Sequence, residues 1–481
     1  MSRVLGTESE VLALSPDASS SKAAKGLQSP AKWPAMGAND VAVWGECQGS
    51  GSKPYQTQVD LSGPSFKCSC PSRKFPCKHG LALMLMRAGG QVPEGVDPPA
   101  WVQTWLDSRQ EKAEKKEAKA AAAAAEPPPD PEVAAKQQAR REDKRWDKVE
   151  AGLQELSLWM QDMVRAGLAN QASDTQMRQR WNNMAARMVD AQATGMAARI
   201  KDCRDLVDSH RDWPRDMLVQ LGHWQLIIDA VRRRESLSPE VKADVMAALG
   251  WPMDKAEVQA RGQLVEDEWL VAGLRMIERE GRLMERRVWL HGQRTGRMAL
   301  VLDYAQGGRG FESAWVPGHR YGCALNFYPG HAPLRAIAAN GNGPALPADG
   351  ASPLANSAVG DVLQLLGQRI AANPLQATQP LCQDRLRLVP AQGQWFAAWP
   401  QALDASPVAP GTAAPVQPVP VAIDDAEAWR LLALSGGAPM QLFGEWEAGP
   451  AVGRWRLLSA WQAREGETAQ QCIWQNQGDP V

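Results

Sequence analysis

The sequence predicts an α+β protein of several domains: an N-terminal ββα module, a central all-helical domain and a C-terminal β-rich region. Three observations support this. The chain has 481 residues, which is too long for a single hydrophobic core. Apolar residues recur at helical spacing through much of residues 146–282, and β-prone runs lie on both sides of that segment.

Composition excludes some broad classes. The 53 basic and 54 acidic residues give a net charge of −1, so no overall field attracts the chain to nucleic acid or to a membrane surface. No apolar run approaches the roughly 18 residues of a membrane span, and the N-terminus lacks the pattern of a secretory signal. We therefore expect a cytoplasmic protein, without a membrane partner, whose cysteines are reduced.

The first module is expected to span residues 1–106. Val41–Trp44 is β-prone, and Tyr55–Leu61 alternates apolar and polar residues, which is typical of a half-buried strand. The Gly-rich run 45–54 between them predicts a turn, so the two strands form a hairpin. A helix of strong helix formers follows, from Gly80 to Arg87.

Four residues with metal-ligand chemistry lie between the hairpin and that helix: Cys68, Cys70, Cys77 and His79. Residues i and i+2 face the same way in extended backbone, so each pair can converge on one ion, with His79 at the very start of the helix. Three thiolates and an imidazole form a closed tetrahedral zinc site, which is typical of structural rather than catalytic zinc. A Cys68–Cys70 disulfide would close a strained ring in a reducing compartment. Cys47 is expected to be a buried strand residue.

Residues 107–145 are rich in Ala, Glu, Lys and Pro and are predicted to be a low-complexity linker, helical in its first half. Residues 146–282 form the predicted helical domain. Trp146, Val149 and Leu153 begin one apolar stripe, and the last helix is expected at about 255–280.

Residues 283–481 are predicted to form one or two β-rich domains. Residues 286–304 suggest a hairpin, 429–434 one of several later strands, and 361–371 a single helix. The composition of residues 404–422 indicates a Pro-rich loop.

The pattern Cys-x-Cys-x6-Cys-x-His, placed between a hairpin and a helix, resembles the SWIM-type zinc finger of bacterial SWIM zinc finger family proteins. The resemblance implies that Cys68, Cys70, Cys77 and His79 bind one structural Zn²⁺. The family is associated with predicted DNA binding and with protein–protein contacts. Its bacterial members are similar to proteins often encoded beside MoxR-type AAA+ ATPases and von Willebrand A-domain proteins, which makes such proteins candidate partners.

Basic residues surround the cluster. Between Lys53 and Arg87 there are six basic residues and one acidic residue, which suits phosphate or acidic partner groups. The candidate surface for nucleic acid or a protein partner comprises Lys67, Arg73, Lys74, Phe75 and Lys78, and Phe66 is a further candidate for stacking on bases.

Three functions remain open. The preferred hypothesis is a zinc-binding, non-catalytic protein whose finger serves protein–protein contacts. The alternative is DNA binding through the basic surface. An uncharacterised enzyme is the third, disfavoured because the chain has no His-Glu-x-x-His, Gly-x-Ser-x-Gly or P-loop motif.

Overall fold

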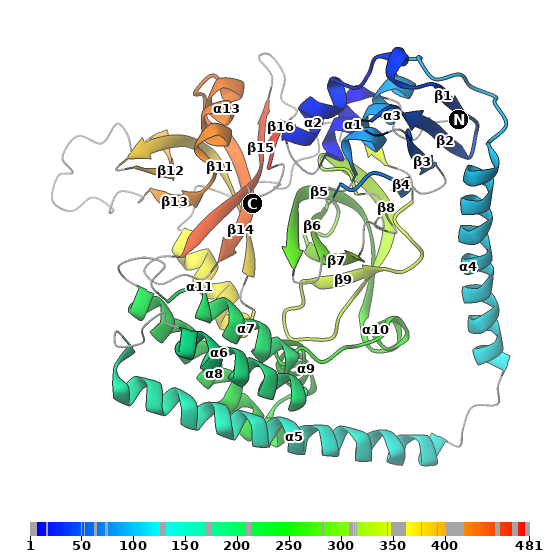
Figure 1. Ribbon diagram of the computed structural model, residues 1–481. Helices are drawn as coiled ribbons and strands as arrows, with labels where there is room; N and C mark the ends of the chain where they lie inside the picture. The colour runs from blue at the N-terminus through cyan, green and yellow to red at the C-terminus, as the bar shows by residue number, and fades with distance from the viewer. Residues whose placement is uncertain are drawn as a thin grey trace.

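The protein folds into a small N-terminal sheet module, a helical bundle and two β-barrels (Figure 1). The computed structural model describes the following residues: 7–15, 18–49, 51, 53–61, 65–72, 76–125, 131–168, 175–207, 213–279, 283–306, 311, 313, 315–343, 345–347, 362–376, 378–391, 393–400, 418–447, 453–463 and 470–476. No helix in these ranges combines the length and the apolar character needed to cross a membrane.

The N-terminal module is built on a four-stranded antiparallel sheet in the order β1-β2-β3-β4, with strands Ala35–Ala38, Ala42–Cys47, Tyr55–Asp60 and Ser65–Cys68. The predicted hairpin is its centre. The two outer strands were not predicted because each has only four residues, too few to show alternation. Helix α3 (Lys78–Ala88) packs on one face of the sheet, and α1 (Glu8–Ala13) and α2 (Ala18–Lys25) pack against α3.

Helix α4 (Ala100–Ala125) covers the other face of this sheet and then extends towards the bundle (Figure 1). Val102 packs with Ala42 and Trp44 of β2. Arg109 donates hydrogen bonds to Asp60 at 2.8 Å and to Ser65 at 3.0 Å. The predicted linker 107–145 is thus largely helical, because helix α5 (Pro131–Ala166) begins well before residue 146; its role as a linker stays a prediction.

The bundle is formed by the C-terminal part of α5 with four further helices: α6 (Thr175–Asp190), α7 (Thr194–Arg204), α8 (Trp213–Arg232) and α9 (Pro239–Ala248). The predicted apolar stripe is confirmed as core: Trp146, Val149 and Leu153 are buried together with Trp181 of α6 and Trp224 of α8.

The predicted helix at 255–280 is wrong. Helix α10 (Lys255–Arg261) ends at Gly262, and a 17-residue strand, β5 (Gln263–Arg279), follows. Trp269 and Val271 of this strand point into a barrel core, whereas Ala272 belongs to a separate core shared with a second barrel. Burial on both faces removes the alternation by which a strand is recognised in sequence.

The first barrel has the strand topology of an OB-fold. Strands β5 to β9 close in the ring order β5-β6-β7-β9-β8, in which only β7–β9 is parallel. The first half of β5 pairs with β8 and the second half with β6, with an irregularity between Val271 and Gly273. This is a five-stranded Greek-key barrel. The other strands are β6 (Leu283–Gly292), β7 (Met298–Gln306), β8 (His319–Phe327) and β9 (Arg335–Ala338), with β10 (Leu346–Pro347) at the edge of β8.

The second barrel repeats this topology. Strands β11 to β15 close in the ring order β11-β12-β13-β15-β14, again with one parallel pair, β13–β15, and β16 pairs with β15. The predicted helix at 361–371 is confirmed as α11. The elements are α11 (Val362–Ala372), β11 (Thr378–Ala391), β12 (Gln394–Ala398), β13 (Val419–Ala422), α13 (Asp425–Ser435), β14 (Met440–Glu447), β15 (Arg454–Ala463) and β16 (Gln470–Gln475).

Two predictions in the second barrel need correction. The predicted strand 429–434 lies inside helix α13, whose N-terminus is capped by Asp424 through its side-chain oxygen and whose C-terminus ends at Gly436 in the left-handed conformation. The predicted Pro-rich loop 404–422 ends in strand β13, and its residues 404–417 lie outside the described part of the chain.

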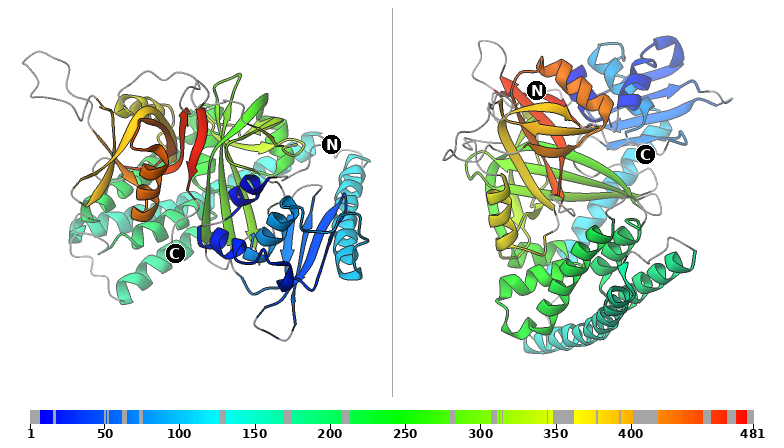
Figure 2. Two further views of the ribbon diagram at one scale, coloured as in Figure 1. Left: turned by 90° about the horizontal axis from the view of Figure 1, so that it is seen from above. Right: turned by 90° about the vertical axis from the view of Figure 1, so that its left-hand side faces the viewer.

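A buried carboxylate joins the two barrels. Glu445 of β14 has no exposed surface and accepts hydrogen bonds from Arg275, Arg287 and Trp289 of the first barrel. A buried charge with several charge-assisted hydrogen bonds fixes the orientation of the two barrels relative to each other, because moving one barrel would leave the charge unpaired. The finger, barrels and bundle form one continuous arrangement, with the barrels side by side (Figure 2).

A close backbone approach in the bundle gives the first prediction. A Cβ at Gly195 would collide with the carbonyl oxygen of Ala248, whereas a Cβ at Gly222 meets nothing within 4 Å. Gly195→Ala should therefore destabilise the bundle by about 1–3 kcal/mol. The matched Gly222→Ala should be neutral or stabilise by up to about 1 kcal/mol, because alanine favours the helix. Thermal unfolding followed by circular dichroism tests this; a midpoint for Gly195→Ala at or above that of the unmodified protein would contradict it.

Candidate metal centre

Four ligand side chains from two elements and the turn between them meet at one point. Cys68 is the last residue of β4, Cys70 lies in the turn after it, Cys77 is the N-cap of α3 and His79 lies in the first turn of α3. Their ligand atoms all lie within 4.8 Å of one another. The predicted position of His79 at the start of the helix is confirmed.

The strand register fixes the first pair of ligands. Thr57 of β3 lies opposite Cys68, and its hydroxyl oxygen is 3.1 Å from the Cys68 sulfur. Ser69 is held to Gln56 twice: its backbone N–H donates to the Gln56 carbonyl, and its hydroxyl accepts from the Gln56 N–H, both at 2.9 Å. These bonds hold the short turn that brings Cys70 to the same side as Cys68.

The helix N-terminus fixes the second pair. The Cys77 sulfur accepts a hydrogen bond from the Gly80 N–H at 3.5 Å, and the helix dipole favours a thiolate at this position. His79 is buried, and its ring packs against Tyr55 with the ring centroids 5.0 Å apart. Its Nδ1 lies 3.8 Å from the Cys68 sulfur and 4.0 Å from the Cys77 sulfur, so Nδ1 is the nitrogen placed to bind a metal.

Three thiols held this close together oppose one another's ionisation. Hydrogen bonds from Cys68 and Cys77 hold the pKa of Cys70 far below its usual range. The same crowding raises the pKa of Cys77, through its hydrogen bonds to Cys68 and Cys70 and through burial. One thiolate therefore forms readily and the next is opposed, so a bound dication is what would hold all three sulfurs as thiolates.

The donor set and spacing fit one zinc ion. With a Zn–S distance of about 2.3 Å, tetrahedral ligand atoms lie about 3.8 Å apart, close to the 3.8 Å and 4.0 Å separations between sulfur and nitrogen in this site. Three sulfurs and one nitrogen fill four positions, which leaves none for water or substrate. The site therefore has the composition of a structural zinc site.

Comparison with known families agrees with this geometry. The profile of the SWIM zinc finger matches residues 55–88. The chain carries a SWIM zinc finger. A second profile, the SWIM-associated four-helix bundle domain, matches residues 144–249, which cover the C-terminal part of α5 and helices α6 to α9. Searches of curated proteins and of solved structures give no match.

Cys47 lies beside the SWIM finger site without belonging to it. It ends β2, has no exposed surface, and is not among the clustered ligands. Burial raises the pKa of its thiol to about 11, so it stays protonated at neutral pH. The prediction of a buried strand residue is confirmed.

Only part of the predicted basic surface lies among the described residues. Lys67 and Lys78 are exposed next to the ligands, whereas Arg73, Lys74 and Phe75 lie outside the described residues. Phe66, predicted as a stacking residue, is buried in the finger core and contacts the position where Gly80 would carry a Cβ. It is therefore not available to a nucleic-acid base.

Sequence reasoning missed the residues that support the ligands, namely Tyr55, Thr57 and Ser69. Their roles depend on the pairing of β3 with β4. Because β4 was not predicted as a strand, no register placed Thr57 opposite Cys68.

Metal content tests the ligand assignment. The purified protein should hold one zinc per chain, measured by inductively coupled plasma mass spectrometry, and Cys70→Ser should lose it because a hydroxyl is a poor zinc ligand at neutral pH. Cys47→Ala is the matched control and should keep the metal. Loss of zinc from both variants would contradict the assignment.

The hydroxyl of Thr57 gives a separate prediction. Supporting groups of this kind change metal affinity by about 10–100-fold, so Thr57→Val should lower zinc affinity by that factor in a chelator competition titration. Thr104→Val is the control, since that hydroxyl donates only to the Ala100 carbonyl on α4. Affinity should also fall with falling pH, because protons compete with zinc for the thiolates. Equal affinities for the two valine variants would rule out a role for Thr57.

Proposed function

We propose that this chain is a zinc-binding, non-catalytic interaction protein whose SWIM finger is a structural module for protein–protein contacts. The observation that carries the proposal is the closed ligand set of three cysteines and one histidine. Zinc in such a site stabilises a fold rather than activating water. A site of three thiolates also needs reduced cysteines, which favours a cytoplasmic location.

The burial of helix α3 favours a role in protein contacts over recognition of DNA by a helix in the major groove. Residues 79–86 of α3 are all buried, and Arg87, the basic residue near the end of the helix, pairs with Glu94 at 3.1 Å. A helix that reads DNA must expose side chains to the major groove. With α3 on one face of the sheet and α4 on the other, neither broad face is free.

The surface left for a partner is the rim around the ligands. It comprises exposed Lys53, Lys67 and Lys78 together with exposed Pro71 and Ser72, which follow the first ligand pair. Zinc would hold this rim in one conformation, which lowers the ordering cost of binding. We propose an acidic surface on a MoxR-type AAA+ ATPase or a von Willebrand A-domain protein as the partner. DNA bound at the same rim is the alternative.

Titration calorimetry with purified candidate partners tests the proposal. Zinc-loaded protein should bind one of them saturably, Cys70→Ser should abolish binding, and Lys67→Glu with Lys78→Glu should weaken it at least about fivefold, because reversing a charge on the rim costs roughly 1 kcal/mol or more. The control, Lys144→Glu with Lys148→Glu, makes the same charge change on exposed residues of α5.

Two results would count against the proposal. If neither class of partner binds, the partner assignment is wrong. If double-stranded DNA binds with a steep salt dependence that is lost only in the Lys67 and Lys78 variant, the DNA alternative replaces it.

A further inference from the structure

The OB-fold topology of the first barrel points to a binding face away from the zinc finger. In OB-folds, ligands lie across the second and third strands and against the loop between the fourth and fifth. These elements are β6, β7 and residues 328–334 in this chain. Topology alone assigns no function. Whether this face binds a ligand depends on its cavities and on the side chains that line them.

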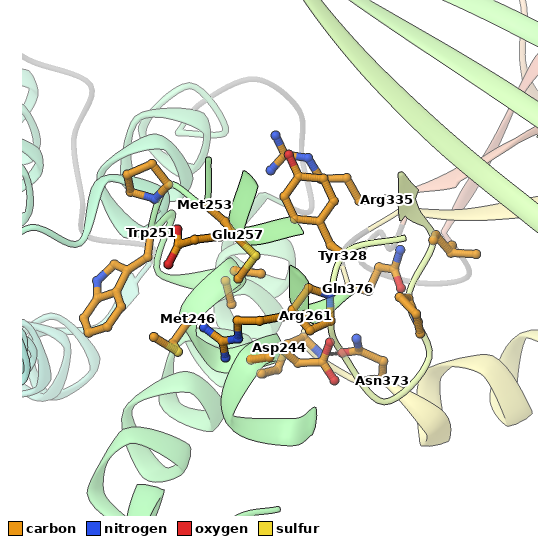
Figure 3. A pocket seen from close by; sticks show the side chains of 18 of the residues that line it. Asp244, Met246, Trp251, Met253, Glu257, Arg261, Tyr328, Arg335, Asn373 and Gln376 are labelled. Carbon is orange, nitrogen blue, oxygen red and sulfur yellow. Dashed lines mark hydrogen bonds between the residues drawn. The ribbon is translucent and has the colours of Figure 1, made fainter. Parts of the chain in front are cut away.

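A cavity of about 460 Å³ lies at this face (Figure 3). Arg287 of β6, Leu300 of β7 and Tyr328 of the loop line its barrel side, and helices α5, α9 and α10 line the other. A neighbouring cavity of about 660 Å³ shares Arg261 and Tyr328 with it. The two cavities adjoin along these shared residues and are together called the bundle–barrel cleft here; two adjoining cavities suit a linear ligand better than a compact one.

The cleft holds arginines without acidic partners. Among the described residues, no carboxylate forms an ion pair with Arg141, Arg145, Arg261 or Arg335, all of which line the cavity. The Arg145 guanidinium lies over the Trp251 ring at 4.1 Å. Figure 3 shows Arg261, Tyr328 and Arg335 at the same pocket, and Arg335 lies over the Tyr328 ring at 4.3 Å.

The three acidic residues that line the first cavity have partners within the protein, and Glu240 lines the second cavity at the N-terminus of α9. Glu142 pairs with Lys242 at 3.3 Å. Asp244 accepts the His331 backbone N–H at 2.9 Å, and Glu257 completes the capping box of α10. Asp244, Glu240 and Glu257 keep their charge, since none of them forms an ion pair among the described residues, but the four arginines outnumber these three carboxylates, so the cleft remains positive on balance.

Arg145 has a buried polar atom at the cleft that no described residue satisfies. Its Nε is buried with no hydrogen-bond partner in the described structure, and burial lowers the pKa of its guanidinium. A bound phosphate would supply both the acceptor and the opposite charge. Arg335 covers one face of the Tyr328 ring, so a base would stack on the opposite face; such stacking adds about 1–3 kcal/mol per base in single-strand binding sites.

We propose that the bundle–barrel cleft binds single-stranded nucleic acid, with Arg141, Arg145, Arg261 and Arg335 contacting phosphates and Tyr328 stacking on a base. The site is independent of the finger and of the interaction proposed for it. In this site the protein would contact the sugar–phosphate backbone and the faces of the bases, and not the base edges in the groove of a duplex. Binding should therefore depend only weakly on sequence.

Fluorescence anisotropy of the full-length protein with a labelled oligothymidylate of about 12 nucleotides, within the site sizes known for OB-folds, tests the proposal. Arg261→Glu with Arg335→Glu should raise the dissociation constant at least about tenfold. The same change should reduce the slope of log affinity against log salt by about 1.4, or about 0.7 for each phosphate that is no longer neutralised. Tyr328→Ala should weaken binding without changing that slope.

The matched control is Arg165→Glu with Arg233→Glu, exposed arginines of the bundle outside the cleft, and it should bind like the unmodified protein. Lys67→Glu with Lys78→Glu should also bind normally, which separates this site from the finger. The proposal is overturned by the absence of salt-dependent binding, by an equal loss in either control, or by equally strong competition from a mononucleotide, which would make the ligand a free nucleotide.

Discussion

Mutual repulsion of three thiolates is the constraint on which the N-terminal module depends. Cys68, Cys70 and Cys77 converge with His79 to within 4.8 Å, and Cys77 resists ionisation there while Cys70 favours it. A dication resolves that conflict, so metal binding and folding are coupled. The first pair of ligands is set by the β3–β4 register and the second by the N-terminus of α3. One ion thus ties the sheet to the helix.

The remaining architecture explains how the zinc site contributes to the fold of the N-terminal half of the chain. The finger packs its sheet between α3 and α4, and α4 extends towards the bundle, so loss of the metal would loosen more than a local loop. The bundle and the first barrel then enclose a cleft in which Arg141, Arg145, Arg261 and Arg335 form no ion pair with a described carboxylate. The two proposed binding sites therefore differ: the first is a small lysine rim beside the zinc ligands, and the second is the bundle–barrel cleft, where arginines lie over Trp251 and Tyr328.

Ligand spacing and helical periodicity were enough to predict the metal site and the bundle core. Cys-x-Cys and Cys-x-His spacing located four ligands, and the stripe beginning at Trp146 is buried as expected. The barrels were harder. Strand β5 is buried on both faces, so its sequence lacks the alternation of a half-buried strand, and helix α13 is marked in the sequence mainly by its caps, Asp424 and Gly436. The cleft was beyond prediction, because Arg145, Arg261 and Arg335 are far apart in sequence and meet only through the barrel topology.

X-ray absorption at the zinc edge of the zinc-loaded full-length protein tests the central claim most directly, because it counts the atoms around the ion. The closed site predicts three sulfurs at about 2.3 Å and one nitrogen at about 2.0 Å, with no oxygen. A shell containing water oxygen, or only two sulfurs, would mean an open position. That result would contradict a structural role and return the site to the candidates for catalysis.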